Sequence, residues 1–305
     1  MLLHILTTAL PVFAALFVGV LCRKKQLLDR AAVSTLKRLA LDVALPFMIF
    51  PAFASADYSR KQLVIPLLMF TVCFAALGLG FVFKKIFHQK SRLMPFLMTG
   101  FESGMLGYGL FALLFPNESS ANYAIVDLAN GLFIFTIFKS MIMGENGSFR
   151  DIVKEAFRSP VLWSILAGVF VGATGIYSAL APSGTVEVIE AVCSFVGAPT
   201  SCLILLTIGY DLELRSINWR RTLSYTAMRA AIMGIMLALL LFLNRRVLGG
   251  LFHEGALMLI LITPASYSTT IFADVEEDRA DIASTLSVMT LLTLILFAVL
   301  AAVVQ

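Results

Sequence analysis

Residues 96–115 read FLMTGFESGMLGYGLFALLF, and this stretch decides how the rest of the chain is interpreted. It contains four glycines, at positions 100, 104, 107 and 109, and one carboxylate, Glu102. A glycine inside a helix costs about 1 kcal/mol relative to alanine, and a charge deep in a bilayer costs about 2.5 kcal/mol or more. The stretch therefore favours a broken helix that lines a polar cavity over a plain membrane anchor.

A second interrupted apolar segment occupies residues 256–274, which read ALMLILITPASYSTTIFAD. Pro264 breaks it, because proline cannot donate a backbone hydrogen bond inside a helix. Two interrupted segments in corresponding halves of a chain are the best sequence indication of a transporter's binding site.

The composition is that of an integral membrane protein. The chain has 305 residues, of which 59% are hydrophobic and 14% are charged, and its mean hydropathy is +0.92. Soluble domains are about 45–50% apolar and about 25% charged. Apolar segments fill nearly the whole length, so no separate soluble domain is expected, and the first segment is interpreted as a retained helix and not a signal peptide. The four scattered cysteines lack metal-ligand spacing, so we expect neither a metal nor another cofactor.

Ten segments are long and apolar enough to be membrane helices, at about 20 residues each. Lys and Arg number 18 in the odd-numbered connections and 4 in the even-numbered ones, with Arg229 inside a segment. This bias predicts that the odd connections are cytoplasmic and that both termini lie outside. The segments are 2–22, 34–55, 62–86, 93–115, 121–143, 160–180, 186–210, 220–243, 254–275 and 281–303.

Ten helices divide into two sets of five. The longest polar connection, residues 144–159, separates residues 1–143 from residues 160–305. Because five is odd, the second set must enter the membrane from the opposite face, which predicts an inverted repeat. Similar offsets support this division, since 153 residues separate Pro46 from Pro199 and 155 separate Gly109 from Pro264.

Three motifs resemble the auxin efflux carrier family, which includes the plant PIN carriers and many bacterial members. The family's fourth helix typically reads Asn-x-Gly-x-x-Gly-x-Pro, and residues 102–109 here read ESGMLGYG, with both glycines in place. In its ninth helix the family shows a proline, small residues, Phe-x-x-Ala, an acidic turn and a Ser/Thr-rich stretch, and this chain has Pro264-Ala265-Ser266, then Phe272-Ala273-Asp274, then Ser284-Thr285. Residues 44–46 read Ala-Leu-Pro, which is also typical. The resemblance spans essentially the whole chain.

The resemblance implies the fold of sodium/proton antiporters and bile-acid symporters. In that fold the fourth and ninth helices break and cross near the midplane, and the substrate binds at the cross. Family members move organic anions, and PIN carriers are homodimers. The short connection at 144–159 is similar to that of bacterial members, which implies an inner (plasma) membrane. Glu102 replaces the family's Asn and Gly109 its Pro, so an anionic substrate would meet an anionic side chain unless Glu102 is protonated or the substrate differs.

Polar residues near the two breaks form the expected site. A cavity of low dielectric constant favours the neutral form of a carboxyl group, so Glu102 is a candidate for proton coupling, or alternatively a structural partner of the broken backbone. Asp127 and Asn130 are three residues apart and share a helix face, although Asp127 could instead lie near the outer interface. The residues expected to bind substrate are Glu102, Ser103, Gly104, Tyr108, Gly109, Asp127, Asn130, Pro264, Ser266 and Tyr267.

Two other charged residues lie inside apolar segments. Arg229 is about two turns from a cytoplasmic end, so we expect its side chain to reach the interface. An anion-binding or charge-compensating role is the alternative. Asp42 lies four residues before Pro46, and we expect it to bond to the kinked backbone or, alternatively, to line a second polar cavity.

These features predict a secondary transporter and not an enzyme, because neither a nucleotide-binding motif nor a protease or esterase motif is present in the sequence. The expected partners are a small organic anion, the bilayer, and protons or sodium, with no nucleic acid. An uncoupled or sodium-coupled carrier, or a receptor or sensor without net flux, remains the alternative.

Overall fold

Prolines and polar caps decide where the helices begin and bend. A computed structural model describes residues 2–143, 158–212, 218–269 and 276–303. Four helices begin at capping side chains that accept a backbone N–H of the first turn, which compensates for the missing intrahelical partners. These caps are Asp29, Ser159, Asn218 and His253. Before Pro46 the helix widens into a π-helical turn, because proline cannot supply the regular hydrogen bond.

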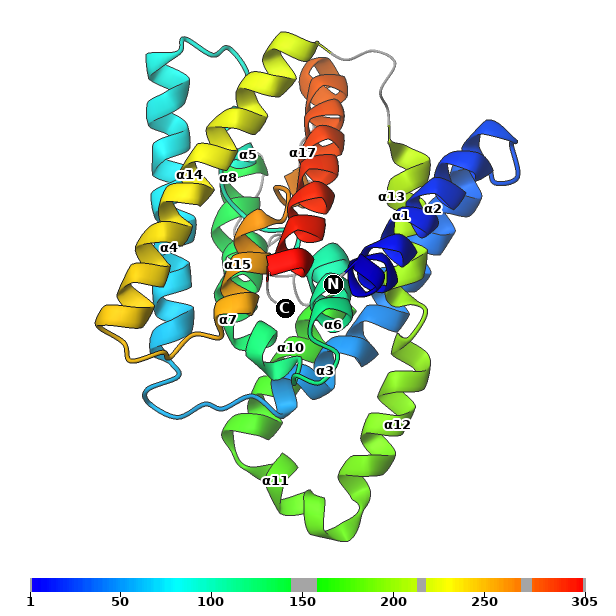
Figure 1. The fold of residues 1–305 in the computed structure, drawn as a ribbon, viewed down its shortest axis with the longest axis vertical. Helices are drawn as coiled ribbons and strands as arrows, with labels where there is room; N and C mark the ends of the chain where they lie inside the picture. Colours follow the sequence, from blue (N-terminus) through cyan, green and yellow to red (C-terminus); the bar gives the residue numbers. More distant parts are fainter. Residues whose placement is uncertain (1, 144–157, 213–217, 270–275, 304–305) are drawn as a thin grey trace.

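All regular structure in the described ranges is helical (Figure 1). The first half contains α1 (Leu2–Lys24), α2 (Arg30–Leu39), the π-helical turn η1 (Ala40–Ala44), α3 (Leu45–Ala54), α4 (Val64–Ile86), α5 (Met94–Leu97), the π-helical turn η2 (Ser103–Gly107), α6 (Tyr108–Leu114), α7 (Ala121–Phe133), the π-helical turn η3 (Ile134–Phe138) and α8 (Lys139–Met143). The second half contains α10 (Pro160–Ala173), α11 (Ile176–Leu180), the 3₁₀ turn η5 (Ala181–Ser183), α12 (Thr185–Gly197), α13 (Thr200–Asp211), α14 (Trp219–Arg246), α15 (Glu254–Ile262) and α17 (Glu276–Val303).

The protein is a multi-pass membrane protein. By length and apolarity, five described helices can cross a membrane, and the count is six if α10 and the α11 segment, which are bent by 72° to each other, form one span. Every one of the ten predicted segments contains helix in its described part. The count of ten spans, the inverted repeat and the division at 144–159 stay predictions.

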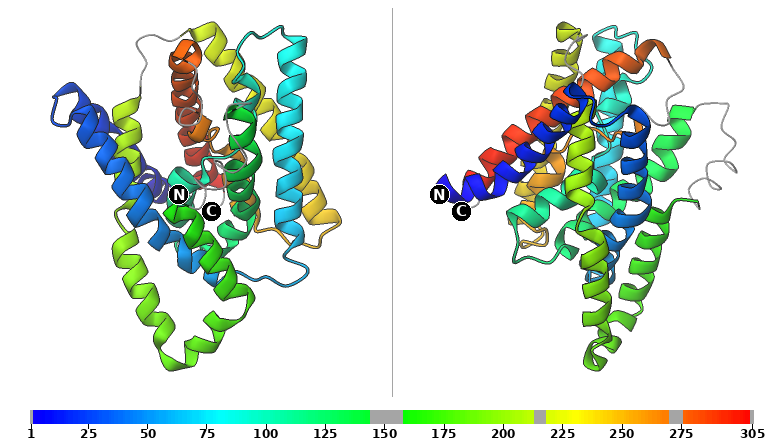
Figure 2. Two further views of the ribbon diagram at one scale, coloured as in Figure 1. Left: turned by 180° about the vertical axis from the view of Figure 1, so that it is seen from behind. Right: turned by 90° about the vertical axis from the view of Figure 1, so that its right-hand side faces the viewer.

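The helices gather into two groups, one mainly at the upper left of Figure 1 and the other at its right and bottom, and Figure 2 shows them from two further sides. We call α4–α8 with α14, α15 and α17 the crossing bundle, because it contains both interrupted segments. We call α1–α3 with α10–α13 the outer bundle. Within the outer bundle α1 packs on α13 and α3 on α10 and α12, and within the crossing bundle α4 packs on α7 and α14 on α17. The bundles touch where α1 meets α17 and where α3 meets α7.

Glycine brings the backbones of α1 and α13 into direct contact. A Cβ atom on Gly19 would lie 2.0 Å from the carbonyl oxygen of Leu206, and one on Gly209 would lie 2.1 Å from that of Leu16. Small residues allow this close approach, which is a common basis of helix association in membranes. The outer bundle is therefore held together by tight backbone packing.

Candidate functional site

The two interrupted segments meet at their breaks. After α5 the chain leaves the helix at residues 98–102, and Gly100 adopts the left-handed region with φ +67°, which glycine enters without steric cost. After α15, Thr263 is extended, and helical structure resumes at residue 268. The backbone N–H of Glu102 donates to the carbonyl of Pro264 at 3.1 Å. The breaks thus satisfy part of each other's backbone.

Glu102 links the breaks a second time through its side chain. Its carboxylate accepts the backbone N–H of Tyr267 at 2.6 Å, and only 5% of the residue is exposed. The Tyr267 hydroxyl shares a hydrogen bond of 2.6 Å with Thr290 on α17. One residue therefore joins the Glu102 carboxylate to α17.

A polar network on α7 holds the first break. The side-chain oxygen of Asn130 accepts the backbone N–H of Phe101 at 3.0 Å, and its amide nitrogen donates to the Phe101 carbonyl at 3.1 Å. The same nitrogen donates to Ser103 Oγ and to Asp127, each at 2.9 Å. Ser103 also donates to Asp127. All of these side chains are buried, so hydrogen bonds within the protein stabilise the Asp127 carboxylate.

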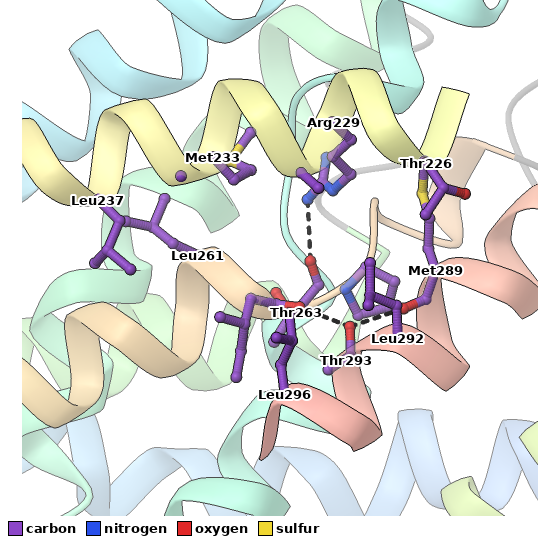
Figure 3. A pocket seen from close by; sticks show the side chains of 14 residues that line it. Thr226, Arg229, Met233, Leu237, Leu261, Thr263, Met289, Leu292, Thr293 and Leu296 are labelled. Carbon is purple, nitrogen blue, oxygen red and sulfur yellow. Dashed lines mark hydrogen bonds between the residues drawn. The ribbon is translucent and has the colours of Figure 1, made fainter. Parts of the chain in front are cut away.

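Arg229 on α14 clamps both breaks from the opposite side. Its guanidinium donates to the carbonyls of Leu97 (3.0 Å), Thr99 (3.3 Å), Gly100 (2.7 Å) and Thr263 (3.2 Å). Figure 3 shows the bond to Thr263. Only 4% of Arg229 is exposed, so the expectation that it reaches the membrane interface is wrong. The backbone carbonyls that lack helical partners at the two breaks attract the cation into the protein. The planar guanidinium has several N–H donors, so it can bond to both breaks at once.

A cavity of about 230 Å³ lies beside the crossing, between the two bundles. Its wall contains three carboxylates, from Asp42, Glu102 and Asp127. Asp42 is exposed, so the cavity is not sealed. Asp42 therefore lines the same cavity as Glu102. The other polar side chains of the wall are Ser103, Tyr108, Asn130, Ser159, Ser266 and Ser268.

Seven of the ten expected site residues line this cavity, namely Glu102, Ser103, Gly104, Tyr108, Asp127, Asn130 and Ser266. Pro264 lines a separate, largely apolar hollow of about 240 Å³ between α14, α15 and α17 (Figure 3). Tyr267 lines a third cavity with Lys37 and Asp211. The expected motif residues 270–274 lie outside the described residues.

Gly109 packs against the outer bundle instead of lining the cavity. A Cβ on Gly109 would lie 2.4 Å from Ser201 Oγ and 2.9 Å from Ser201 Cβ. We expect Gly109→Ala to separate α6 from α13 and to cost about 1–3 kcal/mol, as other overpacked contacts do. The melting temperature of the purified protein should fall, and Ser201→Gly in the same chain should restore it. An unchanged melting temperature in the single variant would contradict this contact.

The sequence reasoning missed two polar residues, one in the cavity wall and one at the contact between the bundles. Ser159 caps α10 and also lines the cavity, and its position before Pro160 is a helix-start signal that says nothing about a cavity. Ser201 meets Gly109 across the bundle interface. Neither contact can be inferred from local sequence, because each depends on how distant helices pack.

Comparisons with known proteins agree on the class of protein. Residues 4–152 match a family described as membrane transport protein. An uncharacterized transporter of Methanothermobacter thermautotrophicus is 26% identical over 219 aligned positions, and the match covers 69% of each chain. Both findings confirm the resemblance to a transporter family that the motifs predict.

Proposed function

We propose that this chain, which is similar to membrane transport proteins, is a secondary active transporter that moves a small organic carboxylate across the membrane by alternating access. The main observation that supports this function is the crossing of the two interrupted helices. Two interrupted helices pair through Glu102 and Pro264, and a cavity lined by polar side chains lies beside them. Broken helices that meet at a cavity are the usual construction of a transporter binding site.

The packing of the two bundles supports a relative movement between them. The ion pair of Lys37 with Asp211 joins α2 to α13, inside the outer bundle. The ion pair of Arg221 with Asp281 joins α14 to α17, inside the crossing bundle. Each bundle thus has polar links of its own, whereas the contact of Gly109 with Ser201 between them rests on close packing. Rigid bodies of this kind can slide or rock against each other.

Glu102 is the proposed proton carrier. Its carboxylate is buried in the cavity wall and bound to a backbone N–H of the second break. Uptake of a proton would remove a negative charge from the site and weaken that bond. Tyr267 also forms a hydrogen bond with Thr290 on α17. Weakening of the Glu102–Tyr267 bond would therefore also affect the position of α17. Protonation would in this way be linked to the arrangement of the crossing.

The rest of the proposal follows the charge bias, the helix count and the family resemblance of the sequence. We place the protein in a bacterial inner membrane with both termini outside, and we propose a homodimer of chains that each contain ten helices in two inverted repeats. Sodium coupling, uncoupled transport and a sensor without flux are the competing functions.

Uptake into proteoliposomes tests the proposal. Labelled monocarboxylates, dicarboxylates and aminocarboxylates are offered to vesicles with and without a pH gradient or a sodium gradient. We expect saturable uptake of at least one solute that follows the pH gradient and is competed by the unlabelled solute. Uptake that follows only sodium would replace the proton by sodium as the coupling ion. Saturable binding without uptake would contradict transport and favour the sensor.

A further inference from the structure

The wall of the cavity carries negative charge from both bundles. Asp42 comes from η1 of the outer bundle, whereas Glu102 and Asp127 come from the crossing bundle. Among the described lining residues there is no lysine, arginine or histidine. An anion that enters this cavity without a proton or another cation therefore meets like charge on two sides, which is costly at low dielectric constant.

Two basic residues near the crossing, Arg229 and Lys37, have partners outside this cavity wall. Arg229 lies on the far side of the crossing, lines the separate hollow shown in Figure 3, and directs its guanidinium toward four backbone carbonyls. Lys37 lines the third cavity and pairs there with Asp211. Neither cation belongs to the wall of the cavity that contains Glu102.

The donors that would receive an anion are also in use. The start of a helical segment offers free N–H groups to anions. Here the N–H of Tyr267, just before the helix resumes, is bound by the Glu102 carboxylate. Likewise, the Asp127 carboxylate already accepts hydrogen bonds from the side chains of Ser103 and Asn130. The chain's own carboxylates take the places that a substrate carboxylate would need.

A buried tyrosine hydroxyl in the wall is also available to an occupant. The Tyr108 hydroxyl lies close to Asp127 without a hydrogen bond of ordinary geometry, and only 3% of the residue is exposed. A buried hydroxyl without a partner costs about 1–3 kcal/mol. Its oxygen can accept a hydrogen bond from a charged N–H group, as the neighbouring carboxylates can.

We propose that the cavity binds a positively charged group, the ammonium of its substrate, so that the transported carboxylate is an aminocarboxylate. The ammonium faces the carboxylates and the Tyr108 hydroxyl, and the hydroxyls of Ser266 and Ser268 remain for the substrate's carboxylate. This inference rests on the proposed transport function for the identity of the solute. The charge preference of the cavity stands independently of transport.

Cysteine reactivity measures that preference without a known substrate. Ser268 is half-buried in the wall, so Ser268→Cys is made in a chain whose four native cysteines are replaced. The purified protein in detergent is treated with a trimethylammonium-ethyl or a sulfonato-ethyl methanethiosulfonate, and both rates are divided by those of free 2-mercaptoethanol. We expect the cationic reagent to react at least about tenfold faster after this correction, because charges a few ångströms apart interact strongly in a protein.

Neutralising the wall should remove the preference. Asp42→Asn should lower the ratio of the two rates several-fold, whereas Glu187→Gln on the exposed face of α12 should leave it unchanged. Equal rates for the two reagents, or a faster anionic reagent, would overturn the proposal. A ratio that Asp42→Asn leaves unchanged would do the same, because the selectivity would then not come from this wall.

Paired solutes test the identity of the substrate. Proteoliposomes are offered 4-aminobutyrate, butyrate and butylamine, which differ only in their charged ends. Competition of uptake or binding by 4-aminobutyrate or butylamine, but not by butyrate, supports the ammonium site. Competition by butyrate alone overturns it. If no solute is taken up while the cationic reagent remains the faster one, the transport function fails and the charge preference stands.

Discussion

Arg229→Met should abolish transport and destabilise the protein by at least about 3 kcal/mol, since each buried carbonyl that loses its partner costs about 1–3 kcal/mol. Four carbonyls lose their donor at once, three in the first break and one in the second. Methionine fills much of the same volume, so the loss is one of hydrogen bonds and charge. Thermal unfolding in detergent and uptake into proteoliposomes would both register the change.

Two further variants define the cause. Arg229→Lys keeps the positive charge but replaces the planar guanidinium, with its several N–H donors, by a single ammonium group. We expect this variant to be more stable than Arg229→Met and to transport slowly. Arg246→Met removes the same side chain from the exposed end of the same helix, and it should behave like the wild type. A fully active Arg229→Met protein would show that the crossing does not need the clamp.

Glu102→Gln should uncouple transport from the pH gradient while leaving the fold intact. Glutamine retains a carbonyl oxygen that can accept the Tyr267 N–H, so the link between the breaks survives without a titrating group. We expect solute exchange to continue and its dependence on the pH gradient to disappear. Exchange and gradient-driven uptake, measured in the same vesicles, separate the two effects.

The matched control for this variant is Glu187→Gln, which removes an exposed carboxylate from α12. It should keep the full response to the gradient. A Glu102→Gln protein with an undiminished response would move coupling to Asp127 or Asp42, the other carboxylates of the cavity wall.

The sequence predicts the helical segments and their interruptions because both are local properties. Apolar length gives the segments, and the glycines near position 104 with Pro264 give the breaks. The long-range contacts were not predictable in the same way. Arg229 donates to the carbonyl of Gly100, which is 129 residues away in the sequence. No residue near Arg229 in the sequence indicates that its side chain would contact these carbonyls.

The site shows the same division between local and distant information. Asp127 and Asn130 share a helix face by spacing alone, and they contact each other. Tyr267 follows a cavity-lining serine, yet it lines a different cavity, because consecutive residues after a break point in different directions. Gly109 was expected at the substrate but meets Ser201, since the partner of a small residue depends on helix packing.

The buried arginine has a consequence for the response to membrane voltage. Arg229 contributes one positive charge to the crossing, and Glu102 and Asp127 contribute two negative charges when both are ionised, so the net charge there is −1. One bound proton makes the crossing neutral, and a second makes it positive. Since an elementary charge that crosses the membrane potential gains or loses about 2.3 kcal/mol per 100 mV, the voltage would favour opposite positions of the empty and the doubly protonated protein.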